Sequence, residues 1–196
     1  MPYEMKPLGC DPSKLKGLSE KLIVSHYENN YGGAVKRLNA IVAQLESLDF
    51  AATPVFVING LKREELIASN SMILHELYFD GLGSEGEPDK DLRGALVRDF
   101  GSLDRWETQF TAMGKALGGG SGWVLLTYSH RDKKLINQWA ADHTCCLAGV
   151  SPILALDMYE HSYHMDYGAK AAAYVDAFMS NINWEDASRL YHEQAR

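Results

Sequence analysis

The sequence contains few cysteines, and their arrangement excludes two kinds of cross-linked fold. Its three cysteines are Cys10 and the adjacent Cys145 and Cys146, an odd number without C-x-x-C spacing. This pattern predicts neither a disulfide framework nor a zinc ribbon, so we interpret the thiols as reduced, mostly buried, small apolar residues. Adjacent residues in an extended segment point in opposite directions, which argues against a bond between Cys145 and Cys146.

Long apolar runs and an excess of positive charge are also lacking. No run approaches the roughly 20 residues that a membrane-spanning helix needs. The first six residues lack the basic and apolar regions of a secretory signal. The formal net charge of -7 argues against nucleic acid or an anionic membrane as a partner, because both favour a basic face. We therefore expect a cytoplasmic protein that binds neither.

What the sequence does contain is typical of a soluble globular protein. It has 196 residues, of which 46% are hydrophobic and 23% charged, enough for one large domain or two small ones. Apolar residues recur at helical spacing from residue 13 to residue 45 and from about residue 61 to residue 79. Gly32-Gly33 predicts a kink or break in the first helix. The loop around Pro54 would join the two as an antiparallel hairpin.

The second half switches to a mixed pattern. Residues 81–88 are rich in glycine and charge, which predicts a linker between a helical domain at 1–86 and a second domain at 87–196. Helices are expected at 92–100, at 103–117 with Ser102 as N-cap, at 158–167, at 169–179 and from 184 onward. Strands are expected at 123–128, 134–139 and 153–156. The predicted class is α+β: an N-terminal antiparallel helical hairpin, then a small three-stranded antiparallel sheet flanked by helices.

Asp157 and His161 are the first candidates for chemistry. The apolar residues 151–156 lead directly into Asp157, so a buried strand would deliver this carboxylate at its carboxyl end. His161 follows four residues later, and in a helix the two would share one face and could bind one metal ion. A buried aspartate is rare unless it is paired or metal-bound. An N-capping aspartate followed by a surface histidine fits the same pattern, however.

Two of the seven histidines, His26 and His75, fall in the middle of the two long helices. A lone helical histidine is more often a satisfied core residue than a ligand. Each histidine becomes a stronger candidate ligand only if the fold brings it next to Asp157 and His161. Three imidazoles and one carboxylate would suit Fe, Mn or Zn, with an open position for a small ligand.

Several motifs together suggest a family. Residues 157–163, followed by Asn183-Trp184, resemble the D-x-W-E-H-A-Y and N-W signature of the iron/manganese superoxide dismutases. Residues 121–123 look like the family's S-G-W at the start of its sheet, and residues 75–79 are similar to its H-S-L-F-W. These motifs occur in the family's order and span nearly the whole chain.

The resemblance implies a redox metal site. His26, His75, Asp157 and His161 would hold one Fe or Mn ion per subunit, with water or hydroxide as a fifth ligand. The ion would cycle between +3 and +2, oxidising one superoxide to O2 and reducing a second to H2O2.

The resemblance also implies an interface between subunits. In the family the glutamate that corresponds to Glu160 crosses a two-fold interface to hold the partner subunit's last metal histidine. We therefore expect a homodimer, which could pair into a tetramer. His164 occupies the position of a family tyrosine next to this interface.

The surroundings of the expected metal depart from the family. Ala34 replaces a gate tyrosine, Asn30 a histidine, and His164 the tyrosine just mentioned. Tyr159 and Phe79 each replace a tryptophan. These exchanges affect the gating and proton-transfer network, so they bear on the rate of dismutation more than on metal binding.

The glutamine that bonds the metal-bound solvent in the family is absent from both of its usual positions, Ser71 and the region of residues 142–143. We take His143 as the candidate replacement donor, although a loop histidine facing water fits equally well. Three hydroxyls could replace the missing gate in part, with simple packing as the favoured alternative for each: Tyr27, Tyr31 and Tyr159.

Two functions follow from these observations. The first is a superoxide dismutase with Fe or Mn. The alternative is a metal-binding dimer on the same scaffold that stores metal, senses it or uses it structurally. The sequence does not choose between Fe and Mn, because both glutamine positions are altered.

Overall fold

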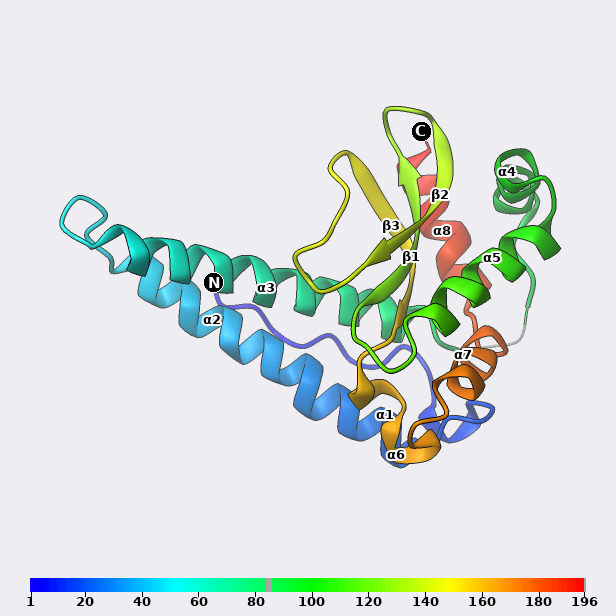
Figure 1. Cartoon of the computed structure of the whole chain (residues 1–196), viewed down its shortest axis with the longest axis horizontal. Helices are drawn as coiled ribbons and strands as arrows, with labels where there is room; N and C mark the ends of the chain where they lie inside the picture. The colour runs from blue at the N-terminus through cyan, green and yellow to red at the C-terminus, as the bar shows by residue number, and fades with distance from the viewer. Residues whose placement is uncertain (84–85, 196) are drawn as a thin grey trace.

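The computed structural model describes residues 1–83 and 86–195 (Figure 1). The first half is helical and contains the turn η1 (Pro12–Lys14), α1 (Glu20–Ser25), the π-helical turn η2 (His26–Tyr31), α2 (Gly32–Glu46) and α3 (Val55–Asp80). The second half contains α4 (Lys90–Phe100), α5 (Leu103–Ala116), β1 (Trp123–Ser129), β2 (Lys134–Ala140), β3 (Val150–Asp157), the 3-10 turn η3 (Glu160–Ser162), α6 (His164–Tyr167), α7 (Ala171–Met179) and α8 (Trp184–Gln194). The predicted α+β class is confirmed.

Helices α2 and α3 form the predicted antiparallel hairpin, which extends away from the rest of the molecule (Figure 1). Val35, Leu38 and Leu45 of α2 are buried at helical spacing, as are Ala68 and Met72 of α3. The apolar stripes that predicted these helices therefore face each other across the hairpin. None of the described helices is long and apolar enough to cross a membrane.

Two helix starts differ from the prediction. The first helix begins at Glu20 rather than near residue 13, because Gly17 adopts a φ of 72° and Ser19 caps the helix by accepting a hydrogen bond from the Leu22 amide. Helix α3 begins at Val55, directly after Pro54, and not at residue 61. Val55 lies at the hairpin tip and is 81% exposed. Because the apolar residues of the tip are not buried along one face, they give no periodic pattern from which the start of the helix could be predicted.

The break expected at Gly32-Gly33 lies one turn earlier. The π-helical turn η2 contains His26, and both glycines belong to the regular helix α2. Gly32 has a packing role instead, because a Cβ there would lie 3.0 Å from the Sδ of Met5. A π-helical turn often marks a functional site, and this one begins at a candidate ligand.

The sheet has the strand order β2-β1-β3, with both pairs antiparallel. All of β1 is buried, and helices α3, α5 and α8 pack against β1 or β3. The register places Trp123 at the start of β1 opposite Asp157 at the end of β3. The register shifts between Leu126 and Thr127, beside Pro152, which has no N–H to donate to the ladder.

The helix predicted at 158–167 is wrong. The chain forms the 3-10 turn η3 and the short helix α6, separated at Tyr163, whose φ is -146°. The Ser162 hydroxyl donates to the main-chain oxygens of Asp157 and Tyr159, which competes with helical hydrogen bonding. Asp157 and His161 therefore do not share a helix face: one ends a strand and the other lies in a turn.

The predicted linker at 81–88 falls partly outside the described residues, since 84 and 85 are not described. Its first residues are packed: Leu82 is buried and forms a β-bridge with Ile182, and the Gly83 amide donates to the Asn181 carbonyl. The division at 86/87 stays a prediction.

The cysteines are free, as expected, but the prediction that most are buried is wrong. Cys10 is half-buried, and Cys145 and Cys146 are exposed. The latter pair lies in the irregular loop between β2 and β3, where exposed backbone leaves little apolar surface to cover them.

Candidate metal centre

Four side chains from four different elements converge at one point. They are His26 of η2, His75 of α3, Asp157 at the end of β3 and His161 of η3, and one ligand atom from each lies within 4.8 Å of the others. The Oδ2 atom of Asp157 lies 3.2 Å from Nε2 of His26, 3.5 Å from Nε2 of His75 and 3.2 Å from Nε2 of His161. The structure therefore brings together all four residues that were predicted to hold a metal.

This arrangement fits a single metal ion. Donor atoms bound at about 2.1 Å to one ion lie about 3.0–3.6 Å apart when the angles at the ion are about 90–120°. Among the described residues, none hydrogen-bonds to the buried ring nitrogens of His26 or to the buried Nε2 atom of His75. Buried polar atoms are rarely left unpaired, and an ion at this point would bind the Nε2 atoms of His26 and His75. Imidazole and carboxylate donors suit Fe or Mn.

Hydrogen bonds orient the ligand atoms. The Nδ1 atom of His75 lies 2.6 Å from the carbonyl oxygen of Ser71. Because a carbonyl can only accept, Nδ1 carries the proton and Nε2 presents a lone pair to the cluster. The Tyr159 amide donates to Oδ1 of Asp157 at 2.8 Å, which leaves Oδ2 directed at the histidines.

Two hydroxyls hold the main chain at Asp157. Ser162 and Tyr174 donate to its carbonyl oxygen at 2.9 and 2.8 Å. Sequence reasoning missed both residues. Tyr174 belongs to the buried stripe of α7, which predicts packing rather than a hydrogen bond to Asp157, 17 residues away. No sequence signal could have paired that tyrosine with Asp157.

The electrostatics of the cluster favour the metal-binding forms of its side chains. Burial lowers the pKa of His75 to about 3 and also lowers the pKa of His26. Burial acts to raise the pKa of Asp157, but contacts with His161 and His26 bring that pKa below its usual value. At neutral pH the cluster therefore combines the neutral imidazoles of His26 and His75 with the ionised carboxylate of Asp157.

His143 and Tyr159 form an aromatic wall beside the cluster. Tyr159 lies between His143 and His161 in a parallel stack, with ring centroids 4.8 and 5.4 Å apart and interplanar angles of 13° and 9°. The main-chain oxygen of His143 accepts a hydrogen bond from Asn70 on α3. His143 lies in the loop between β2 and β3 and is half-buried at the edge of the site.

The predicted gate hydroxyls of Tyr27 and Tyr31 have other partners. The Tyr31 hydroxyl donates to Glu76 at 3.0 Å and accepts from the Lys6 amide at 2.8 Å. The Tyr27 hydroxyl donates to the Lys6 carbonyl at 2.6 Å. Both rings pack against Phe79, which itself contacts His26. These contacts favour the packing alternative for both tyrosines.

Glu160 lies in the same turn as His161, and His164 begins the following helix α6; both side chains are exposed. Within the described part of the chain, neither side chain has a hydrogen bond or an ion pair. Both side chains therefore remain available to a second molecule.

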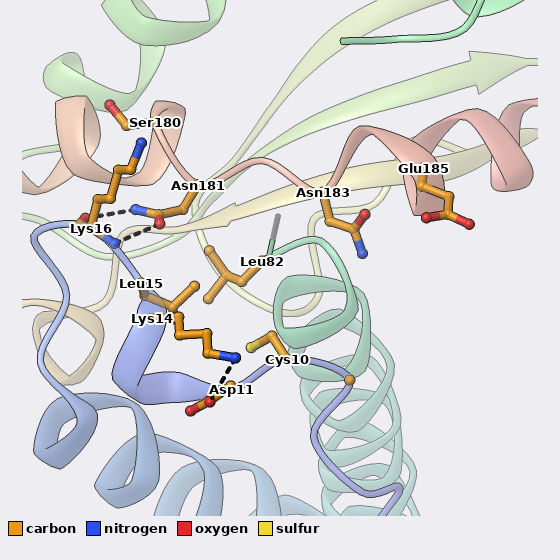
Figure 2. Close-up of a pocket in the computed structure, with 12 residues that line it drawn as sticks. Cys10, Asp11, Lys14, Leu15, Lys16, Leu82, Ser180, Asn181, Asn183 and Glu185 are labelled. Atoms are coloured by element: carbon orange, nitrogen blue, oxygen red, sulfur yellow. Dashed lines mark hydrogen bonds and ion pairs between the residues drawn. The ribbon is translucent and has the colours of Figure 1, made fainter. Parts of the chain in front are cut away.

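A surface pocket elsewhere has less to offer chemically (Figure 2). It is lined by Cys10, Lys14, Asn181 and Glu185, among others. The Asn181 amide binds the main chain of Lys16 through both of its polar atoms. Asn181, the most buried polar side chain of this pocket, is therefore engaged in hydrogen bonds that hold the main chain. The four-residue cluster is the candidate centre.

Comparisons with known proteins find relatives that are named for iron or for manganese. Residues 88–190 match the family model described as iron/manganese superoxide dismutases, C-terminal domain. The chain is 72% identical over 196 residues to superoxide dismutase [Fe] of Cupriavidus metallidurans, covering 100% of both chains. It is 35% identical over 190 residues to superoxide dismutase [Fe] of Aquifex pyrophilus, covering 93% of this chain and 88% of the relative. It is 32% identical over 201 residues to superoxide dismutase [Mn] 2 of Haloferax volcanii, covering 98% of this chain and 97% of the relative.

Proposed function

The chain belongs to the iron/manganese superoxide dismutase family, and we propose that it disproportionates superoxide at one Fe or Mn ion held by His26, His75, Asp157 and His161. The observation that carries the proposal is the convergence of these four donors around buried nitrogens without partners. The products are O2 and H2O2.

The relatives favour this reaction over the alternative of a storage, sensing or structural metal protein. The relative that is 72% identical over its full length is named as an iron superoxide dismutase. We infer iron as the native metal on the same ground, and manganese as the metal to test beside it, since a 32% identical relative is named for manganese.

When bound, the ion supplies the one-electron chemistry that oxidises one superoxide and reduces another. The protein's part is to hold four donors in their binding forms. Asp157 contributes one carboxylate oxygen because its other oxygen is held by the Tyr159 amide. His75 contributes Nε2 because its Nδ1 proton is held by Ser71. Burial of both side chains keeps water from competing for these contacts.

His143 and Tyr159 are the proposed hydrogen-bond donors inside the site. Their stack against His161 supports this role, because it places an imidazole and a phenol beside a metal ligand. Burial raises the pKa of Tyr159 to about 12, so its hydroxyl keeps its proton at neutral pH. For Tyr31 the proposed part is indirect, since its hydroxyl binds Glu76, the residue that follows the ligand His75.

We further propose a homodimer in which Glu160 and His164 contact the partner, and which could pair into a tetramer. The exposure of both side chains beside His161 supports this arrangement. A cytoplasmic location is supported by the free cysteines, since reducing compartments keep thiols unpaired.

Superoxide turnover by pulse radiolysis, on protein loaded separately with Fe and Mn, tests the function. We expect at least one form to consume superoxide much faster than the same ion free in solution. His161→Ala should lose both metal and activity, because it removes one donor and opens the cluster to water.

His130→Ala is the matched control. His130 is exposed, bonds Ser151 and lies outside the four-residue cluster, so its loss should leave metal content and turnover unchanged. Stoichiometric metal binding without turnover above the free ion would exclude a dismutase and leave the storage or sensing alternative.

A further inference from the structure

The segment before η1 lies along the hairpin of α2 and α3 (Figure 1). The Tyr3 amide donates to the side-chain oxygen of Asn39 at 2.8 Å, and the side-chain nitrogen of Asn39 donates back to the Tyr3 carbonyl at 2.9 Å. Met5 packs against the start of α2, since a Cβ at Gly32 would lie 3.0 Å from its Sδ atom. Residues 3–6 therefore form an N-terminal strap across the hairpin.

Lys6, the last residue of this strap, bonds to two separate elements. Its main chain binds η2, because its amide donates to the Tyr31 hydroxyl at 2.8 Å and its carbonyl accepts from the Tyr27 hydroxyl at 2.6 Å. Its ammonium lies 2.6 Å from Oε2 of Glu76 on α3. The Tyr31 hydroxyl in turn donates to Oε1 of Glu76 at 3.0 Å. The strap therefore ties η2 to α3 through one residue.

Both tied elements carry a candidate metal ligand next to the point of contact. Tyr27 directly follows His26 in the chain, and Glu76 directly follows His75. The side chain of Glu76 is only 15% exposed, whereas that of Lys6 is 60% exposed. The strap thus reaches from the surface to the backbone that bears two of the four ligands.

The position of His26 depends on its turn more than the position of His75 does. The Nδ1 atom of His75 lies 2.6 Å from the Ser71 carbonyl, whereas none of the described residues hydrogen-bonds to Nδ1 of His26. The backbone of η2 and packing against Phe79 therefore place the imidazole of His26. Since π-helical turns are rare and η2 lies between two α-helices, contacts from outside the helix help to keep it in this form.

We propose that the N-terminal strap retains the metal ion, with Lys6 as a positioning residue that holds η2, and with it His26, against α3. The inference rests on the proposed function for the metal, but the tie between strap and turn is a property of the polypeptide. His26, His75 and Asp157 are buried, so an ion leaves only when part of the site opens. Release of the strap frees the turn of one ligand without unfolding the sheet.

Amide hydrogen exchange of the metal-free full chain, followed by mass spectrometry, tests the tie without any metal or activity assay. Lys6→Met removes the ammonium and keeps the length of the side chain. We expect exchange of residues 26–31 to become about 2-fold to 5-fold faster, the range for loss of one exposed ion pair. Exchange of β1 should stay unchanged, because that buried strand opens only when the chain unfolds.

Tyr31→Phe is the stronger variant, since it keeps the ring and removes the hydroxyl that bonds both Lys6 and Glu76. We expect about 10-fold faster exchange of residues 26–31, because two hydrogen bonds are lost and one of them involves a carboxylate. Lys6→Arg keeps a cation opposite Glu76 and should restore the wild-type rate. Wild-type exchange of residues 26–31 in Tyr31→Phe, or equal acceleration in β1, would overturn the proposal.

Lys62→Met is the matched control. Lys62 is 55% exposed and pairs with Glu65 of the same helix α3, so its ion pair joins no two elements. Its loss should leave the exchange of residues 26–31 unchanged. An acceleration as large as that of Lys6→Met would show that any lost ion pair on the hairpin has this effect, and would overturn the role of the strap.

Metal release tests the consequence. Protein loaded with iron is mixed with excess EDTA, and the first-order loss of iron is measured. Lys6→Met and Tyr31→Phe should release iron faster than the wild type by the same factors as their exchange, about 2-fold to 5-fold and about 10-fold, and Lys62→Met should not. Wild-type release rates in both strap variants would overturn the proposal. A wild type that binds no iron would contradict the proposed function, while the exchange data would still decide whether the strap holds η2.

Discussion

At the scale of single residues, protonation decides when the cluster can bind a metal. His26 and His75 are buried without solvent to stabilise a positive charge, so burial lowers their pKa values in the folded chain. In the unfolded chain each would titrate near 6.5. Protons therefore bind the unfolded state more strongly, and acid opposes both folding and metal binding.

The metal-free chain should accordingly lose stability as the pH falls below about 6.5. The sign follows from linkage: a histidine with a depressed folded pKa contributes stability above its unfolded pKa, and loses it as the pH falls toward the folded value, about 3 for His75. The slope for each such histidine is at most about 1.4 kcal/mol per pH unit. Urea unfolding at a series of pH values measures it.

Asp157 acts in the same direction at lower pH, because its folded pKa lies below 3.8 and its contribution is lost as the carboxylate is protonated. His75→Gln is the comparison variant, since an amide replaces the imidazole without a titrating group. It should show a shallower dependence between pH 6.5 and 4. A metal-free chain that gains stability on acidification over this range would contradict the assignment of neutral buried histidines.

At the scale of elements, the entry to β1 is the most constrained backbone near the site. Gly122 has a φ of 129°, and a Cβ at this position would lie 2.1 Å from the carbonyl oxygen of Ala140. Its own carbonyl accepts from the Met158 amide, directly after Asp157. A change at Gly122 would therefore displace both the strand that bears Trp123 and the turn that follows Asp157.

Gly122→Ala should destabilise the chain by at least about 1–3 kcal/mol, because both the backbone conformation and the space exclude a methyl group. Gly94→Ala is the matched control. Gly94 lies in α4 with nothing within 4 Å of an added Cβ, so alanine should stabilise that helix by up to about 1 kcal/mol. Urea unfolding of both variants, with metal content beside it, gives the comparison. Equal unfolding midpoints for the two variants would show that Gly122 is not constrained in this way.

The turn after β3 differs from the helix that its sequence pattern predicts. Residues 158–167 have the composition of a helix, but Ser162 binds two main-chain oxygens and the chain forms a 3-10 turn. The tighter turn brings Nε2 of His161 within 3.2 Å of Asp157. The two side chains lie close together, as predicted, although the helical geometry used to predict this was wrong.

At the scale of the whole molecule, the site is built from both halves of the chain. His26 and His75 come from the helical first half, and Asp157 and His161 come from the part that contains the sheet. Helix α3 packs against β3, which brings the two pairs together. If the predicted division at 86/87 is correct, the metal centre lies between two domains and would hold them together.

The proposed dimer predicts an effect of Glu160→Gln on association. A neutral amide is a weaker acceptor for an imidazole N–H than a carboxylate, so the dimer should dissociate at a higher protein concentration. Sedimentation velocity over a range of concentrations measures this change. Glu107→Gln is the control, since Glu107 is exposed on α5 and far from η3 in the sequence. Identical sedimentation of Glu160→Gln and the wild type would argue against the interface.

Periodic features of the fold were predictable from the sequence. Apolar residues that repeat with the helical period predict the hairpin of α2 and α3, and those that fit strands predict the three strands. The repeats exist because one face of each element is buried in the core. Helix starts were less predictable: the exposed tip at Val55 and the turn at Gly17 depend on local hydrogen bonds and dihedrals that leave no periodic trace.

The sequence by itself determined the α+β class, the candidate ligands and the family, because residue types at particular spacings carry that information. Only the tertiary structure decided that His26 and His75 reach Asp157, that Tyr174 holds its carbonyl, and that Trp123 donates to His143. The physical reason is that these contacts join residues far apart in the chain, and their geometry depends on how α3, the sheet and α7 pack together.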